Sequence, residues 1–399
     1  MGDGLTFVAV ISPQHKATIF AAVTLVANSR TLRSEQLIGN SRMRDVAALA
    51  GVSTMTVSRA LSGSANVTQE ARNRIEMAVR KLNYHPNEVA RSLRHQRSRQ
   101  IGIVVPNLLD PFFATCAHGV STVAKKNGYS VVIALSDDDS SAEREQVLSM
   151  ARQHLEGILL LPGACRHDPL LWRFRSAPMV VLDHPLESAP LDTVMVDNRR
   201  AAANAVRHLI RLRHRTIVHL NLNPAAYTLQ QRDQGYRDAM FEAALVPQTL
   251  FVRDPATEII PILRELRRKR QKLALFCSNN VITRGTLHAI SELGLRIPND
   301  VALVGFDDFE TADLLRPGMT VIRQPILELG KQGAEMLFRR IRSAETIYER
   351  EQITLPVELI IRGSCGAPKA SWTSATANKS GRHKDDAAPS DCYAMASPR

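Results

Sequence analysis

The chain has 399 residues, of which 44% are hydrophobic and 23% are charged. At about 100–200 residues per domain, this length predicts two to three compact units. The composition is that of a globular protein, so it excludes a wholly disordered chain, a collagen and a bundle of membrane helices. The 51 Lys and Arg outnumber the 39 Asp and Glu, and the formal net charge of +12 is compatible with a polyanionic partner.

The five cysteines are far apart and odd in number, and no pair has the Cys-x-x-Cys spacing. This pattern argues against a disulfide framework and against a zinc cluster, and it is typical of a protein of the reducing cytoplasm. We expect neither a metal ion nor a cofactor.

Residues 1–41 contain an apolar stretch that is interrupted by Pro13, Gln14, His15 and Lys16. The two runs that remain are too short to cross a bilayer, and the basic start of a secretory signal is missing. We expect a disordered extension here and no association with a membrane.

Residues 42–100 are helical in pattern and basic, with eleven Lys and Arg against four Asp and Glu. Val46, Ala47 and Ala50 share one face of a first helix, which Gly51 ends, and Ser53 is a good N-cap for a second helix. Such a corner is typical of a helix-turn-helix, and a third helix with apolar residues at helical spacing follows it. A structural hairpin is the alternative interpretation, which the basic surplus disfavours.

From residue 101 onward, short β-branched runs alternate with amphipathic helical segments. Continuous apolar strands spaced by helices are what a parallel sheet covered on both faces requires. Two successive sets of these units predict two doubly wound lobes, with ligands at the carboxyl ends of the strands. The expected strands are residues 101–105, 130–134, 157–161, 179–182, 216–220, 273–276 and 301–305.

The helix-turn-helix also carries a specific string of residues, continued after the third helix. The string reads Asp45-Val46-Ala47, Ala50-Gly51-Val52-Ser53, Thr56-Val57-Ser58-Arg59, Leu82-Asn83-Tyr84-x-Pro86-Asn87 and Ala90-Arg91-Ser92-Leu93. It resembles the headpiece of the lactose/galactose repressor (LacI/GalR) family, in its purine-repressor-like form. The resemblance covers residues 43–362.

The resemblance implies an all-α helix-turn-helix headpiece joined to an α/β core of two lobes, with the fold of periplasmic binding proteins. The expected organisation is an extension at 1–41, the headpiece at 42–86, a hinge helix and linker at 87–100, an N-terminal lobe of 101–197 with 325–354, a C-terminal lobe of 198–324 with 355–365, and a disordered tail at 366–399.

For DNA binding, the start of the second helix offers small polar and apolar groups to base edges, and Arg59 offers a fork suited to guanine. The resemblance adds a hinge helix whose Leu93 wedges into the minor groove; packing of Leu93 against the first lobe is the alternative. The candidate DNA-binding residues are Ser53, Thr54, Met55, Thr56, Ser58, Arg59, Asn87, Ala90 and Leu93.

For effector binding, the resemblance points to residues that follow predicted strands. Asp and Asn accept hydrogen bonds from hydroxyls, Arg donates them, and Phe offers an apolar face to a ring. The candidates are Asn107, Phe112, Asp183, Arg232, Asn279 and Asp307. As alternatives, Asp307 and Asp308 are turn residues, and Arg232 pairs with neighbours of Asp233 on a helix. The chain departs from the family at Asn280, where an acid is usual, and at Thr283.

Together these features predict a repressor that binds a near-palindromic operator in double-stranded DNA as a homodimer. A small effector, expected to be a carbohydrate, controls its operator affinity from between the lobes. A periplasmic-type sugar-binding protein is the alternative, but the basic headpiece argues against it. The common enzyme motifs are missing from the sequence, so a binding protein is favoured over an enzyme.

Overall fold

The computed structural model describes residues 41–61, 66–84, 98–163, 177–186, 191–222, 224–269, 272–343 and 349–372. The chain divides into two compact units, Met1–Arg91 and Ser92–Arg399. Residues 1–40, most of the expected hinge helix and residues 373–399 lie outside the described ranges.

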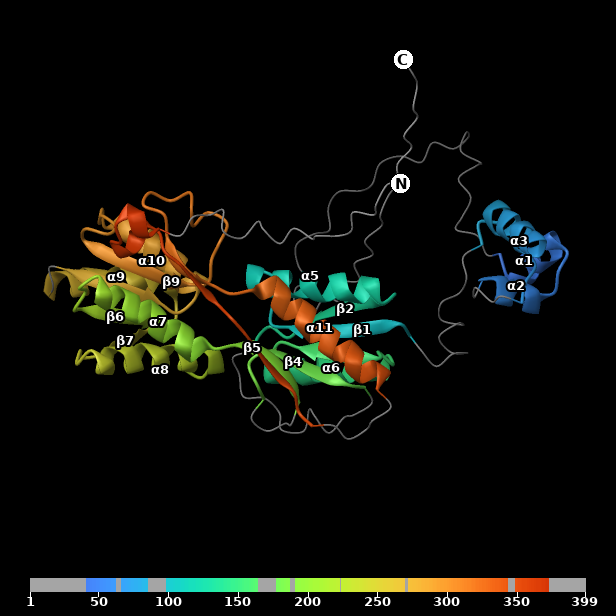
Figure 1. The fold of residues 1–399 in the computed structure, drawn as a ribbon, viewed down its shortest axis with the longest axis horizontal. Coiled ribbons are helices and arrows are strands. Elements are labelled where there is room, and N and C mark those ends of the chain that lie inside the picture. The colour runs from blue at the N-terminus through green and yellow to red at the C-terminus, as the bar shows by residue number, and fades with distance from the viewer. Residues whose placement is uncertain are drawn as a thin grey trace, which may run out of the picture. The chain divides into compact units, whose positions relative to one another are not determined.

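The described residues of the first unit form the helices α1 (Met43–Ala50), α2 (Thr54–Leu61) and α3 (Gln69–Lys81) (Figure 1). Gly51 ends α1 in the left-handed conformation, with φ of 64°. A residue with a side chain would adopt this backbone conformation only at a cost in free energy. Thr68 caps α3 by accepting a hydrogen bond from the Ala71 amide. Val46, Val57, Ile75 and their apolar neighbours form one small core between the helices. The expected helix-turn-helix and its covering helix are confirmed.

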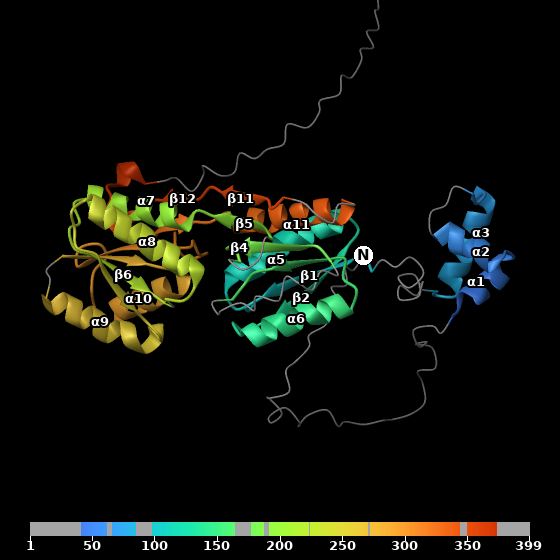
Figure 2. The same cartoon turned by 90° about the horizontal axis from the view of Figure 1, so that it is seen from below.

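The N-terminal lobe is built on a six-stranded sheet of order β11-β5-β4-β3-β1-β2, in which every pairing is parallel. Helices α5 and α11 pack together on one face of the sheet, and α6 covers the other (Figure 2). The strands are β1 (Gln100–Val105), β2 (Ser130–Leu135), β3 (Gly157–Leu160), β4 (Met179–Asp183), β5 (Asp192–Val196) and β11 (Gln352–Leu355), and the helices are α5 (Pro111–Lys126), α6 (Ser140–Arg152) and α11 (Ile326–Arg342).

The C-terminal lobe repeats this plan, with the order β12-β10-β9-β8-β6-β7 and only β12 antiparallel to its neighbour. The two lobes confirm the prediction of two doubly wound, mostly parallel sheets. The strands are β6 (Ile217–Asn221), β7 (Gln248–Phe251), β8 (Leu273–Cys277), β9 (Val301–Phe306), β10 (Thr320–Arg323) and β12 (Glu358–Ile360), and the helices are α7 (Asn198–Arg211), α8 (Tyr227–Glu242), α9 (Pro255–Lys269) and α10 (Asn280–Glu292).

Two glycines let α5 and α11 approach closely. A Cβ atom on Gly119 of α5 would lie 2.3 Å from the Leu327 carbonyl oxygen of α11. A Cβ atom on Gly330 of α11 would lie 2.1 Å from the Cys116 carbonyl oxygen of α5. Because both obstacles are backbone atoms, the crossing needs glycine on each helix.

The chain crosses between the lobes three times: from β5 into α7, from β10 into α11, and from β11 into β12. After β12, residues expected to belong to the tail are part of the C-terminal lobe. Two short 3₁₀ helices, Gly363–Cys365 and Lys369–Ser371, follow, and Ala367 is buried in the core of that lobe. The indole nitrogen of Trp372 donates to the Ala367 carbonyl oxygen at 3.0 Å. The tail boundary expected at residue 366 is therefore wrong, because an apolar residue and a capping contact anchor the next few residues.

Candidate functional site

Helix α2 presents an exposed first turn in the basic headpiece. Thr54 and Arg59 are exposed, and the Met55 side chain is 55% exposed although it is apolar. The opposite face of the helix is buried through Val57 and Ala60. The second helix of a helix-turn-helix reads base edges with its N-terminal residues, and α2 has its candidate residues on its exposed side.

The side chain of Ser53 has a structural task at the start of α2. Its Oγ accepts a hydrogen bond from the Thr56 amide at 3.1 Å and lies 2.9 Å from the Thr56 hydroxyl. Ser53 therefore caps the helix as expected, and the two hydroxyls hold each other in place. Asn87, Ala90 and Leu93, the candidate hinge contacts, fall outside the described residues.

A cleft of about 700 Å³ lies between the two lobes, at the carboxyl ends of their parallel strands. All six candidate effector residues line it. From the N-terminal lobe come Asn107, Phe112 and Asp183, and from the C-terminal lobe come Arg232, Asn279 and Asp307.

Arg232 is held rigidly at the floor of the cleft. Its Nε donates to the Asn198 side-chain oxygen and its Nη1 donates to the Ser278 carbonyl oxygen, both at 2.8 Å. The guanidinium also lies 3.6 Å from the centre of the Phe306 ring, a cation–π contact. Burial lowers the pKa of this guanidinium, while the negative charges of Asp307, Asp183 and Asp110 oppose that shift.

Asp307 lies beside Arg232, with its Oδ2 3.8 Å from the arginine Nη1. Burial raises the pKa of the Asp307 carboxyl, and Arg232 and a hydrogen bond from Gln324 counteract this rise. The same carboxylates that stabilise the charge on Arg232 raise the pKa of Asp307, so the floor of the cleft is a crowded acidic cluster around one cation.

Asp183 and Asp307 occupy corresponding places in the two lobes, at the ends of β4 and β9. Both have left-handed backbones, with φ of 75° and 74°. Residues other than glycine seldom adopt this conformation, and it costs on the order of 1–3 kcal/mol where the surroundings enforce it. Backbone strain of this kind clusters at functional sites, which supports a ligand-facing role for both aspartates.

Two other candidates cap local structure as well as lining the cleft. Asn107 Oδ1 accepts from the amides of Leu109 and Asp110, each at 3.0 Å, which closes the turn before α5. Asn279 caps α10 by accepting from the Ile282 amide at 3.0 Å. Phe112 is almost fully buried, so little of its ring surface is open to the cleft.

Asn280, Asp110 and Gln324 line the cleft and make polar contacts there, although they were not among the candidates. Asn280 donates from Nδ2 to Asp110 Oδ1 at 3.1 Å, so this bond joins the two lobes across the cleft. Gln324 donates to the Asp307 carboxylate and is itself buried. Asp110 followed by Pro111 is a typical start of a helix, so the sequence offered a signal that Asp110 is held in place. No sequence pattern indicated Gln324.

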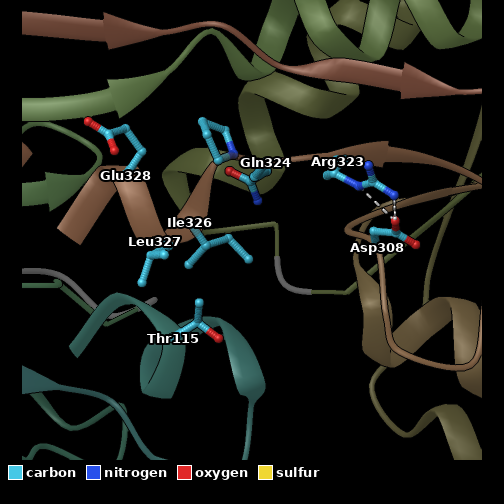
Figure 3. A pocket seen from close by; sticks show the side chains of 8 residues that line it. Thr115, Asp308, Arg323, Gln324, Ile326, Leu327 and Glu328 are labelled. Carbon is cyan, nitrogen blue, oxygen red and sulfur yellow. Dashed lines mark hydrogen bonds and ion pairs between the residues drawn. The ribbon is translucent and has the colours of Figure 1, made fainter. Parts of the chain in front are cut away.

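A second, smaller cavity of about 380 Å³ adjoins the segment that leads from β10 into α11 (Figure 3). Gln324 lines both cavities. On one wall, Asp308 accepts hydrogen bonds from Arg323 at 2.9 and 2.6 Å, and Arg362 lies against the same carboxylate. Thr115, Ile326 and Leu327 contribute a wall from the N-terminal lobe.

In the described ranges, no three His, Cys, Asp or Glu side chains come together as a metal site would require. Among the helices that the structure describes, not one has the length and apolar character of a bilayer-spanning segment.

Comparison with known proteins assigns both parts of the chain. A family model described as bacterial regulatory proteins, lacI family, matches residues 42–87, and a periplasmic binding protein-like domain matches residues 206–365. The ribose operon repressor of Haemophilus influenzae is 33% identical over 286 residues, which are 71% of this chain and 86% of the relative.

Solved structures share the architecture. The Lac repressor dimer bound to operator and the anti-inducer ONPF has a TM-score of 0.75 at 24% identity, covering 82% of this chain and 99% of that one. The transcriptional regulator CelR in complex with cellobiose has a TM-score of 0.60 at 27% identity, covering 82% of this chain and all of that one. The chain therefore belongs to the lacI family of bacterial regulatory proteins.

Proposed function

We propose that this DNA-binding transcriptional regulator is a repressor, and that a small carbohydrate in the cleft controls its affinity for operator DNA. The observation that carries the DNA-binding half is the exposed first turn of α2 on a basic helical unit. The carbohydrate half is supported by the polar cleft, by the relative named for a ribose operon, and by the cellobiose complex of CelR.

On DNA, Thr54, Met55 and Arg59 would contact base edges in the major groove, with Ser53, Thr56 and Ser58 near the backbone of the duplex. In the hinge, Leu93 would wedge into a base step of the minor groove, assisted by Asn87 and Ala90. A homodimer would place two headpieces on the halves of a near-palindromic operator. The Lac repressor, which has a similar structure, is bound to operator as a dimer.

In the cleft, Arg232 would donate hydrogen bonds to the effector, Asp183 and Asp307 would accept them from its hydroxyls, and Asn107, Asn279 and Phe112 would complete the walls. A ligand that touches both lobes favours one arrangement of the lobes over another. Because the lobes continue into the hinge, such a ligand would alter operator affinity through the coupling between the two sites.

Two other functions receive less support. A solute-binding protein for transport would have no use for the helix-turn-helix unit. An enzyme would need reactive groups activated within the cleft, whereas Arg232 and Asp307 are held by neighbouring side chains and serve binding. We infer that the protein has no catalytic activity and that it acts in the cytoplasm, where its DNA is.

The substitution Arg59→Ala tests the DNA-binding half. We expect it to cost about 1–3 kcal/mol on a duplex selected by the wild-type protein from a random library, and much less on random DNA. Arg74→Ala, which removes an exposed arginine from α3, is the matched control and should weaken both DNAs slightly. Fluorescence anisotropy at fixed salt measures both, and equal losses on the two DNAs for Arg59→Ala would make Arg59 a phosphate contact.

A further inference from the structure

The cleft is acidic. Five aspartates and two arginines line it, which leaves a surplus of three negative charges. The aspartates are Asp110, Asp137, Asp138, Asp183 and Asp307, and the arginines are Arg232 and Arg284. Inside a cleft with low-dielectric walls, such a surplus produces a stronger potential than it would on an open surface.

The buried cation of the cleft is already engaged by the protein. Two nitrogens of Arg232 donate hydrogen bonds to Asn198 and Ser278, and Asp307 Oδ2 lies 3.8 Å from Arg232 Nη1. Arg284 is exposed. A phosphate or carboxylate entering this cleft would therefore meet carboxylates before it met an uncommitted buried cation.

Two buried acceptor atoms in the lining have no hydrogen-bond partner among the described residues. They are Asp183 Oδ1 and Gln324 Oε1. Each belongs to a side chain that is otherwise anchored, since His184 Nδ1 lies 3.5 Å from Asp183 Oδ2 and Gln324 donates to Asp307. An acceptor left buried without a donor is costly, so a ligand that brings donors to both atoms binds favourably.

We propose that the cleft selects a ligand that has several hydroxyl donors and no negative charge, and that it rejects the phosphate ester of the same ligand. This inference rests on the proposed function and narrows its carbohydrate effector to the free sugar. Hydroxyls donate to Asp183 Oδ1 and Gln324 Oε1, while the acidic surplus repels a phosphate. The regulator then responds to the free sugar, which is the substrate of a phosphoryl-transfer reaction, and not to the phosphorylated product.

The test uses matched pairs of probes on the full chain. Titration calorimetry compares D-ribose with D-ribose 5-phosphate, D-glucose with D-glucose 6-phosphate, and D-fructose with D-fructose 6-phosphate. In the pair that binds, we expect the neutral sugar to bind at least about 100-fold more tightly, because like charges brought together in a binding site cost several kcal/mol. A phosphate that binds as tightly as its parent sugar overturns the inference.

The variant Asp183→Asn probes the proposed cause. Asparagine tolerates the left-handed backbone at this position, so the fold is expected to persist. Removing one carboxylate should lower the ratio of the two dissociation constants, sugar phosphate over neutral sugar, about tenfold. Asp313→Asn removes an exposed carboxylate that does not line the cleft, and it should leave the preference unchanged. An unchanged preference in Asp183→Asn overturns the electrostatic explanation.

Operator binding measured with the same probes distinguishes failure of the charge rule, the selection of a neutral sugar over its phosphate, from failure of the proposed function. A sugar phosphate that binds and changes operator affinity contradicts the charge rule but leaves the proposed function standing. If no probe binds or changes operator affinity, both the carbohydrate effector and the charge rule fail.

Discussion

One buried histidine has no part in the proposed site, yet its surroundings make it sensitive to pH. His219 in β6 has no exposed surface and lies against the rings of Tyr236 and Phe276. Its Nδ1 lies 2.9 Å from Asp233 Oδ1 and donates a hydrogen bond to this carboxylate. Burial lowers the pKa of the His219 ring, and the carboxylate of Asp233 only partly offsets this shift.

This residue predicts a loss of stability on mild acidification. Below about pH 6.5 the unfolded chain protonates this histidine and the folded chain does not, so folding stability falls as the pH drops through that value. Between pH 7.5 and 5.5 we therefore expect His219 to account for part of the loss in the free energy of unfolding. His208, whose pKa burial also lowers, contributes in the same direction.

Urea unfolding of wild type, His219→Asn and His118→Asn at both pH values measures the effect. His118 is exposed on α5 and serves as the control. The stability of His219→Asn should depend less on pH than that of the other two proteins, and an identical dependence in all three would disprove the assignment. In the wild-type protein, burial favours a higher pKa for Asp233, but hydrogen bonds from His219, Thr249 and Arg237 lower this pKa overall.

At the same scale, all six residues to which the family resemblance pointed line the cleft. Asn107, Asp183, Asn279 and Asp307 end or closely follow apolar strands that are easy to recognise, whereas Phe112 and Arg232 lie in helices. The sequence did not predict Gln324 or the role of Asn280. Gln324 is far in sequence from its partner Asp307 and reaches the cleft only because the chain crosses between lobes there. Asn280 was noticed as a departure from the family, but its bond to Asp110 depends on how the lobes meet.

Among the elements, the crossing of α5 and α11 leaves no room for a side chain at either glycine. We expect Gly330→Ala to destabilise the protein by about 1–3 kcal/mol, because the new methyl group would collide with the Cys116 carbonyl oxygen and the helices would have to separate. Since α5 begins beside the cleft, sugar affinity should fall as well. Glu335→Ala, at an exposed position of α11, is the control, and unfolding in urea with titration of the sugar measures both. Wild-type stability in Gly330→Ala would mean that the helices tolerate a wider crossing.

The strands show where sequence patterns stop being informative. The continuous apolar strands at the centre of each sheet were predicted, whereas β5, β7, β10, β11 and β12 were not. Most of the missed strands lie toward the sheet edges and are only three to five residues long. In β11, half-buried and exposed residues alternate, so its sequence lacks the apolar run of a central strand.

For the whole molecule, the bond between Asn280 and Asp110 is a direct link between the lobes. Asp110 is held in place because it also accepts from the Phe112 amide at 3.0 Å. Asn280→Asp would set a carboxylate against this fixed carboxylate, and two like charges at such a distance repel. We expect the cleft to open and sugar affinity to fall about tenfold.

Small-angle scattering and calorimetry measure the two effects of Asn280→Asp. Asn204→Asp, at an exposed position of α7, adds the same charge away from the cleft and should change neither quantity. If Asn280→Asp has the wild-type radius of gyration and affinity, the bond does not influence the arrangement of the lobes.

The three crossings between the lobes also have a consequence for synthesis of the chain. The N-terminal lobe begins with β1, but Leu329, Met336 and Phe338 of α11 cover its core, and β11 closes its sheet. While a ribosome makes the C-terminal lobe, one face of the nascent first sheet therefore remains incompletely covered, for roughly 6 to 25 s at about 5–20 residues per second. The headpiece, by contrast, is contiguous and can fold as soon as it emerges. A growing polypeptide would thus possess its DNA-binding helices well before it possesses a sensor.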